Sequence, residues 1–262
     1  MVIRALLLLL LSAPVFAAVT ESGTSSTDLY DIDEVSDWSS RVVVHTVPSG
    51  AEALVCSIFM RGNDATATTI AAEWDDGGTD EAMTSVDETA ANDNGGDLHV
   101  ETFIRLSPTA ATSDVTFTAT GGTVDTSSII CTNWDNVDTT DVATATNVIG
   151  EEVNNTNSTT CEVASGGTTG NLLYAAIALK HSASEPSPPA YSESWAAVDQ
   201  TDSTVDNSTE AEVAVVAAAS AYTATLANTV SDESACHVIE LVEGSAASVV
   251  PLIHHHNMQM GQ

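Results

Sequence analysis

The sequence has very few basic side chains. Only five lysines and arginines stand against 37 aspartates and glutamates, so the formal net charge is −32 at pH 7. Proteins that bind nucleic acids through phosphates need clustered lysine and arginine, so this shortage excludes that class of partner. An anionic membrane surface would repel the chain for the same reason. Such a balance keeps a protein soluble and suits salty water, where counter-ions screen self-repulsion, so we expect a marine or saline setting.

Motifs of the common enzyme classes are also missing. The sequence has no G-x-S-x-G nucleophile elbow, no H-E-x-x-H zinc motif and neither of the glycine-rich patterns that bind phosphates or dinucleotides. Carboxylate pairs for glycoside hydrolysis carry no information here, because 37 acidic residues offer pairs everywhere. We therefore expect a protein that is not an enzyme, and a hydrolase with an unrecognised site stays as an alternative.

Cysteine is sparse, and no two cysteines form a C-x-x-C motif, which excludes zinc ribbons and thioredoxin-like redox sites. Four cysteines in an exported chain allow two disulfides or, alternatively, four buried thiols. We predict that Cys131 bonds Cys161, because these residues lie on strands that follow one another in the chain. The second predicted bond joins Cys56, on an early strand, to Cys236 on the last one.

The two ends of the chain differ from its middle. Residues 1–17 combine Arg4, an apolar run and small residues before Ala18, which predicts a secretory signal peptide. The apolar run is shorter than the roughly 20 residues of a membrane span, so we expect no span after signal removal. An uncleaved lipid anchor or a buried N-terminal segment is the alternative. We expect an N-terminal extension at 18–39, a β-sandwich domain at 40–243 and a C-terminal tail at 244–262.

The middle of the chain reads almost entirely as β-strands. Threonine, serine and valine dominate, and glycine, asparagine and aspartate recur at short intervals, which favours an all-β sandwich. We predict a two-sheet antiparallel β-sandwich with jelly-roll-like connections. The segment at 171–179 is apolar on both faces, as a central strand requires. The expected strands cover residues 41–47, 51–60, 68–75, 82–89, 97–106, 114–120, 127–134, 159–165, 171–179, 210–220, 221–227 and 234–242.

Four segments suggest a relationship to a known family. HTVPSGAEALVCSIF, NWDNVDTTD, GNLLYAAIAL and ACHVIELVEG follow one another along the sequence. Together they resemble a β-sandwich domain found in secreted proteins of marine bacteria and in structural proteins of their phages, over residues 40–243. The resemblance implies a sandwich fold and an extracellular or virion setting, and the family has no shared catalytic residues to transfer. The chain departs from the family at Asn136, where a glycine is usual.

Histidine and tryptophan are the remaining candidates for a binding site. In the strand at 97–106, His99 and Glu101 share one face, and Leu98 and Val100 share the other. We expect His237 to be a buried, hydrogen-bonded histidine rather than a catalytic one. Exposed tryptophans would suit a carbohydrate-binding module, and the alternative is that they pack in the core. The four candidates are Trp38, Trp74, Trp134 and Trp195.

Two loops, 74–81 and 91–97, place acidic and amide side chains beside glycines, as calcium loops do. Neither has the spacing of an EF-hand loop, so acidic turns without metal are the alternative. We therefore assign no metal ligands and no cofactor, and keep calcium as an option at these loops.

The tail ends in VVPLIHHHNMQMGQ. Three adjacent histidines can bind a transition metal, but their side chains diverge in an extended segment. A frayed terminus is one alternative. We predict instead that the tail docks on a neighbouring subunit, through an apolar anchor, adaptable methionines and pH-sensitive histidines. The residues of this assembly tail are Val249, Val250, Leu252, Ile253, His254, His255, His256, Met258 and Met260.

These observations lead to one functional expectation and two alternatives. We expect a non-enzymatic structural or decoration protein, located extracellularly or on a virion surface. Its partners would be other copies of itself or neighbouring virion or cell-surface proteins. A carbohydrate-binding or adhesion module, with glycans as partners, is the first alternative, and the hydrolase is the second.

Overall fold

The computed structural model describes residues 18–30, 39–62, 68–91, 97–121, 124–154, 160–165, 167–180, 190–191, 195–201, 209–218, 222–227 and 234–244. Most of them lie in antiparallel β-strands, as the β-branched and alternating sequence predicts. The predicted all-β, sandwich-like fold is confirmed, but the described strands form four sheets rather than the two predicted for residues 40–243; the jelly-roll-like connections stay a prediction. The signal segment 1–17 and tail residues 245–262 lie outside the described residues. No helix in the described part of the chain is long and apolar enough to cross a membrane.

Two sheets come from the first half of the chain. Its strands are β1 (Thr20–Glu21), β2 (Ser26–Tyr30), β3 (Ser40–Val47), β4 (Ala53–Gly62), β5 (Thr69–Asp75), β6 (Asp80–Ala82), β7 (Thr84–Ala91), β8 (Asp97–Leu106), β9 (Ala111–Thr120) and β10 (Thr126–Asp135). Sheet A has the order β10–β4–β8–β7, and both β1 and β2 pair with the outer edge of β10. Sheet B has the order β3–β9–β5–β6. The predicted N-terminal extension, 18–39, therefore contributes two strands to sheet A.

The second half of the chain forms two further sheets. Its elements are α1 (Val142–Ala145), β11 (Thr146–Asn154), β12 (Thr160–Ser165), β13 (Leu172–Lys180), β14 (Ala190–Tyr191), β15 (Ala196–Thr201), β16 (Thr209–Ala217), β17 (Tyr222–Ala227) and β18 (Ser234–Leu241). Sheet C has the order β11–β18–β13–β16–β15, and sheet D has the order β12–β17–β14. The alanine-rich segment of β16 is a strand, as predicted, because it lies between β13 and β15 in the sheet.

The two halves repeat one strand topology. The path β2–β10–β4–β8–β7 in sheet A corresponds strand for strand to β11–β18–β13–β16–β15 in sheet C. The path β3–β9–β5 in sheet B corresponds in the same way to β12–β17–β14 in sheet D. A register shift occurs at Val86 in the sequence SVDET and at Val198 in AVDQT, at matching places in β7 and β15. The chain therefore contains two copies of one sandwich, repeat 1 (20–135) and repeat 2 (146–241).

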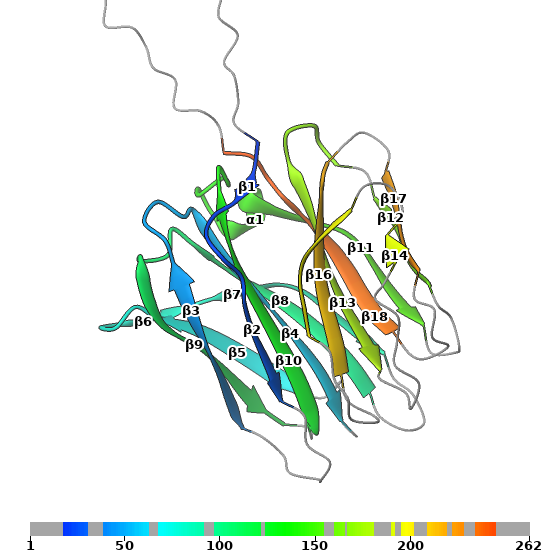
Figure 1. Cartoon of the computed structure of the whole chain (residues 1–262), viewed down its shortest axis with the longest axis horizontal. Coiled ribbons are helices and arrows are strands. Elements are labelled where there is room, and N and C mark those ends of the chain that lie inside the picture. Colours follow the sequence, from blue (N-terminus) through cyan, green and yellow to red (C-terminus); the bar gives the residue numbers. More distant parts are fainter. Residues whose placement is uncertain are drawn as a thin grey trace, which may run out of the picture.

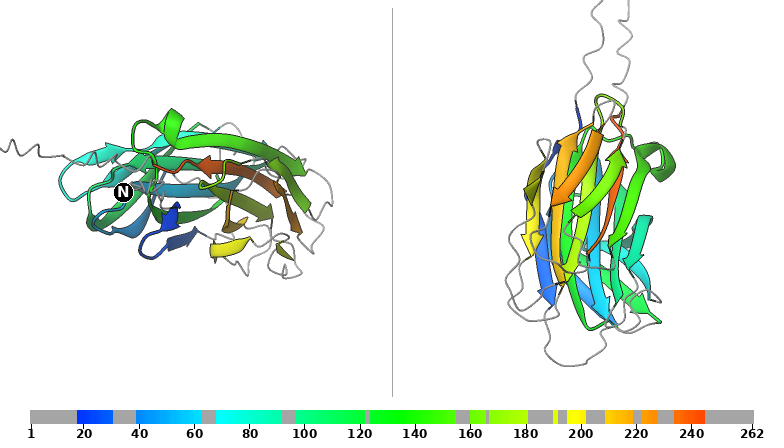
Figure 2. Two further views of the ribbon diagram at one scale, coloured as in Figure 1. Left: turned by 90° about the horizontal axis from the view of Figure 1, so that it is seen from above. Right: turned by 90° about the vertical axis from the view of Figure 1, so that its right-hand side faces the viewer.

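The repeats are stacked through sheets A and C, so four sheets follow one another in the order B, A, C, D (Figure 1). One apolar cluster fills the space between sheets A and C, and contains Phe59, Trp134 and Tyr174. A second cluster, with Phe103 and Phe117, lies between sheets A and B. Figure 2 shows the molecule from above (left) and from the side of repeat 2 (right). This arrangement encloses β4 and β13 on both faces, which explains their nearly continuous apolar sequences.

A disulfide joins Cys56 on β4 to Cys131 on β10, with 4.1 Å between the two Cα atoms. Both predicted pairings, Cys131–Cys161 and Cys56–Cys236, are therefore wrong. The two bonded cysteines lie directly opposite each other in the β4–β10 ladder, although 75 residues separate them in the sequence. Order along the chain was a poor guide because β4 and β10 are neighbours in sheet A. Cys236 is also disulfide-bonded, and the side chain of Cys161 lies outside the described part of the structure.

The segment between the repeats is held by local hydrogen bonds. Asp141 caps the short helix α1 by accepting a hydrogen bond from the backbone N–H of Thr144. Asn136 has a φ of +62°, a left-handed conformation that glycine and asparagine tolerate best. Its side-chain nitrogen donates to the carbonyl of Ala18, and its own carbonyl accepts from the N–H of Gly244. Asn136, where the related family usually has glycine, thus forms hydrogen bonds with residues at both ends of the described part of the chain.

Candidate functional site

Three of the four candidate tryptophans are core residues. Trp74 and Trp134 are at most 1% exposed and Trp195 is 7% exposed, and Trp38 lies outside the described residues. The indole N–H of Trp74 donates to the carbonyl of Thr109, and that of Trp134 donates to the hydroxyl of Thr132. Buried rings cannot stack on a sugar from solution, so these three tryptophans offer no platform to the carbohydrate-binding alternative.

The loop 74–81, considered above as a calcium site, has carboxylates that already accept backbone hydrogen bonds. This loop closes a hairpin, since β5 pairs with β6. Asp75 accepts from the N–H of Gly77, and Asp76 accepts from those of Gly78 and Thr79. These bonds hold the pKa of Asp76 below its ordinary value. The carboxylates therefore stabilise the turn itself. Most of the second loop, 92–96, lies outside the described residues.

A chain of buried polar side chains crosses the interface between the repeats. His237 on β18 bonds through Nε2 to the hydroxyl of Thr102 on β8, at 2.7 Å, and its Nδ1 lies 3.2 Å from the hydroxyl of Thr89 on β7. The hydroxyl of Thr102 in turn bonds that of Ser57 at 2.7 Å, and Ser57 bonds the phenol of Tyr174 at 2.9 Å. We call these five residues the polar seam. The prediction that His237 is buried and hydrogen-bonded is confirmed.

The polar seam is surrounded by apolar side chains, so its members stay neutral. Burial lowers the pKa of His237 to about 3, and the nearby His99 adds to this shift. Burial also raises the pKa of Tyr174. Each polar atom has a partner on the other repeat or on the same ladder, and this arrangement avoids the cost of an unsatisfied buried group. The seam therefore fixes how sheets A and C sit on each other.

Asp87 lies at the rim of this interface. Its Oδ2 atom is 3.8 Å from Nδ1 of His237, and its side chain is 9% exposed. Burial raises the pKa of Asp87 to about 7, and the charges of Glu151 and Glu88 push it in the same direction. A carboxyl group with such a pKa is half protonated near neutral pH, which is a feature often found at functional sites.

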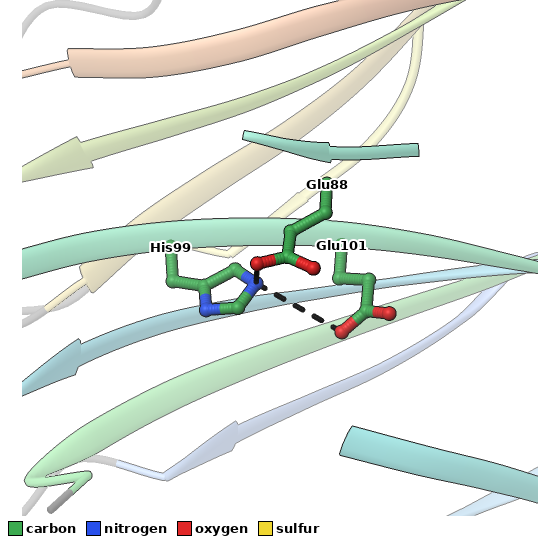
Figure 3. A group of neighbouring side chains, drawn as sticks. All are labelled: Glu88, His99 and Glu101. Carbon is green, nitrogen blue, oxygen red and sulfur yellow. Dashed lines mark ion pairs between the residues drawn. The ribbon is translucent and has the colours of Figure 1, made fainter. Parts of the chain in front are cut away.

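A second polar group lies on the opposite face of sheet A, at its β7 edge. Glu88 on β7 and Glu101 on β8 are directly opposite each other in the ladder. His99 is two residues before Glu101, so its side chain leaves the same face. Figure 3 shows the imidazole of His99 directed at both carboxylates. We call these three residues the edge triad.

The edge triad has converging ligand atoms. Nε2 of His99 is 3.6 Å from Oε1 of Glu88 and 3.8 Å from Oε2 of Glu101. His99 is fully buried and Glu101 is 5% exposed, whereas the Glu88 side chain is 54% exposed. The other oxygen of Glu101 accepts a hydrogen bond from Ser85 at 2.6 Å. Burial raises the pKa of Glu101 to about 7, and the charge of Glu88 raises it further against the Ser85 bond.

The sequence predicted how two of the three edge-triad residues are placed relative to each other. Alternation along 97–106 placed His99 and Glu101 on one face, and that placement is confirmed by their common contact with Glu88. Glu88 was one of 37 acidic residues without a distinguishing motif. Only the register between β7 and β8 brings it opposite Glu101.

A shallow depression of about 510 Å³ lies beside α1 and the start of β13. Its wall includes Asn147 and Asn171, whose side-chain nitrogens both donate to the carboxylate of the buried Glu240. The side-chain oxygen Oδ1 of Asn171 accepts from the backbone N–H of Glu243. These polar groups bond one another, and so they serve the fold rather than a ligand.

No protein-family model, curated protein or solved structure matches this chain. The resemblance to the marine and phage sandwich domains therefore rests on the sequence motifs alone, and function has to be argued from the chain's own surfaces and sites.

Proposed function

We propose that this chain is a non-enzymatic structural protein, exported to a cell surface or carried on a virion, which assembles through contacts between its copies. The fold supports this role because separate apolar clusters between the sheets join four stacked sheets into one continuous unit. The observation that carries the proposal is a surface with little charge on sheet B.

This surface is the outer face of β3 and β9, which we call the β3–β9 face. Val42 and Val44 are 44% and 63% exposed there, and are among the few large apolar side chains in the described residues that face solvent. Most other positions on this face are threonine, and the hydroxyls of Thr46 and Thr112 bond each other at 2.9 Å. The face consists of Ser40, Val42, Val44, Thr46, Thr112, Asp114, Thr116 and Thr118.

Charge explains why this face suits a second copy of the chain. Two molecules with a net charge of −32 repel each other, and they can meet only where acidic side chains are few. Asp114 is the single acidic member of the β3–β9 face, and the nearest acidic side chain on the next strand, β5, is that of Glu73, opposite Thr116. Within the described residues, β3 pairs only with β9 and is therefore an edge strand of sheet B, although its Thr46 carbonyl already accepts a hydrogen bond from the side-chain nitrogen of Asn133. The assembly tail, 249–262, is the second element that we assign to contacts between copies.

Sedimentation velocity of the mature chain tests this proposal over a range of protein and salt concentrations. We expect reversible self-association that strengthens with salt, because salt screens the repulsion. The double variant Val42→Asp/Val44→Asp adds two charges to the β3–β9 face and should weaken association at least about tenfold, or roughly 1.4 kcal/mol.

The matched control is Val148→Asp. Val148 is 48% exposed on β11, at the edge of sheet C, so the change replaces an exposed valine with one negative charge at a site outside the β3–β9 face. Association should be unchanged in this variant. A mature chain that stays monomeric at all salt concentrations would contradict the proposal, and so would a double variant that associates as strongly as the control.

A further inference from the structure

We infer that the edge triad, Glu88, His99 and Glu101, binds a divalent transition metal of the zinc type. The inference rests on the placement of three ligand side chains on one face of two neighbouring strands, and on the burial of two of them. The site lies at the edge of sheet A that is opposite to β1 and β2.

Two carboxylates directly opposite each other in a β-ladder repel, and this repulsion destabilises the pair unless something compensates. Here the pair is Glu88 and Glu101. The next strand, β4, adds no charge on this face, because Ile58 lies opposite Glu101 and Met60 lies opposite His99. A bound cation would remove the repulsion at the place where the fold creates it.

The distances within the edge triad suit a small metal ion. The three ligand atoms all lie within 4.8 Å of one another. In a tetrahedral zinc site with bonds of about 2.0–2.1 Å, neighbouring ligand atoms are about 3.3 Å apart. The separations of 3.6 Å and 3.8 Å from the imidazole nitrogen need only a small contraction. Glu88 can supply the larger movement, because its side chain is 54% exposed.

The type of ligand selects the type of metal. Calcium takes six to eight oxygen ligands, and magnesium usually keeps most of its waters. The edge triad offers one imidazole nitrogen and two carboxylates, a set that favours zinc and related transition ions. Three protein ligands leave a fourth position for water on the exposed side of Glu88. A bound ion would therefore join β7, the edge strand of sheet A, to β8.

Repeat 2 contains a natural counterpart without the histidine. Gln200 on β15 lies opposite Glu212 on β16, as Glu88 lies opposite Glu101. The position that corresponds to His99, two residues before Glu212, is Glu210. By residue type, repeat 2 therefore has an amide and two carboxylates where repeat 1 has an imidazole and two carboxylates. We assign the metal to repeat 1 only.

Equilibrium dialysis against Zn²⁺, in high salt with excess Mg²⁺ to occupy the acidic surface, measures the stoichiometry. We expect one tightly bound zinc per chain. The variant Glu88→Gln should bind zinc at least about 100-fold more weakly, since loss of an outer partner alone costs about 10–100-fold. Glu88→His keeps a ligand at this position and should retain the zinc. Both changes are at a half-exposed side chain, so the fold should persist, and circular dichroism checks this.

Two controls separate the edge triad from other acidic or histidine-rich segments. Glu73→Gln removes an exposed glutamate on β5 and should leave zinc binding unchanged. The tail variant His254→Ala/His255→Ala/His256→Ala removes the histidine run and should also retain one zinc. With Co²⁺ as the probe, the visible absorption of the bound ion should disappear in Glu88→Gln and persist in the two control variants.

Three outcomes would overturn the inference. The wild-type chain would bind no zinc under these conditions, or Glu88→Gln would bind zinc as tightly as Glu73→Gln. In the third outcome the zinc would be lost with the tail histidines, which would place the site in the tail.

Discussion

Repeat 1 and repeat 2 share their strand order and their bulge, but they have different side chains at matching buried positions. Thr102 and Ser57 on sheet A of repeat 1 occupy the ladder positions that Val213 and Ala176 occupy on sheet C of repeat 2. The polar seam therefore consists of hydroxyls from repeat 1 that meet His237 and Tyr174 from repeat 2. The comparison shows that the topology depends on apolar alternation and turns, whereas single polar positions are open to change.

The bulged strands give a second contrast. Asp87 and Asp199 follow the bulge in β7 and β15. Asp87 faces His237 and Glu151 of the other repeat in a buried setting, which raises its pKa to about 7. Asp199 accepts a hydrogen bond of 2.6 Å from the hydroxyl of Ser25, near the N-terminal strands. The same backbone position thus holds a carboxyl group with a raised pKa in one repeat and a carboxylate bonded to Ser25 in the other.

The largest expected effect comes from the disulfide of repeat 1. Cys56→Ala/Cys131→Ala opens a loop with a sequence separation of 75 residues, and the chain-entropy relation gives a loss of about 4 kcal/mol. At the matching ladder position of repeat 2, Ala175 lies opposite Val238, so the corresponding pair forms no such bond. Denaturant unfolding measures the loss. A variant as stable as the wild type would show that sheet A needs no covalent link.

A smaller effect is expected from Thr102→Val, which gives repeat 1 the residue that repeat 2 has at this ladder position. The change keeps the shape but leaves Nε2 of the buried His237 without its hydroxyl partner. We expect a loss of about 1–3 kcal/mol, because a buried polar atom then has no hydrogen bond. Thermal unfolding monitored by circular dichroism measures it. An unchanged midpoint would mean that the polar seam does not hold the two repeats together.

The smallest expected change in stability comes from Asp87 and depends on pH. Because folding raises the pKa of Asp87 to about 7, the folded state binds its proton more tightly than the unfolded state. The stability that this group contributes is present at low pH and is lost as the pH rises through about 7. Asp87→Asn should therefore raise the thermal midpoint at pH 8 relative to wild type, and this gain should vanish near pH 4.

The matched control for this change is Asp199→Asn in repeat 2. It weakens the bond from Ser25 and should lower the thermal midpoint slightly at pH 8. If both variants were stabilised equally, a general reduction of negative charge would explain the result, and the contrast between the two aspartates would fail.

The sequence predicted most of the strands because alternation and turn residues are local signals. The strand at 97–106 coincides with β8, and the double-sided apolar strand at 171–179 is β13 within one residue. Two of the missed strands, β11 and β15, lie at the edges of sheet C; β11 is interrupted by glycine and two glutamates, and β15 has a single large apolar residue. The repeated topology was hidden because the two copies share little more than the SVDET and AVDQT segments.

Pairings between distant segments could not be predicted in this way. The bond between Cys56 and Cys131 depends on β4 and β10 being neighbours, and the edge triad depends on the register of β7 against β8. Both are properties of the assembled sheet rather than of any one strand. The buried state of Trp74, Trp134 and Trp195 was one of two alternatives that the sequence left open, and packing decided it.

The difference between the two repeats is tested most directly by anomalous scattering at the zinc absorption edge, from crystals of the mature chain equilibrated with Zn²⁺. We expect a strong peak between Glu88, His99 and Glu101 in repeat 1, and no peak at the matching positions Gln200, Glu210 and Glu212 in repeat 2. Peaks of equal height in both repeats, or a peak only at the histidines of the tail, would contradict the account.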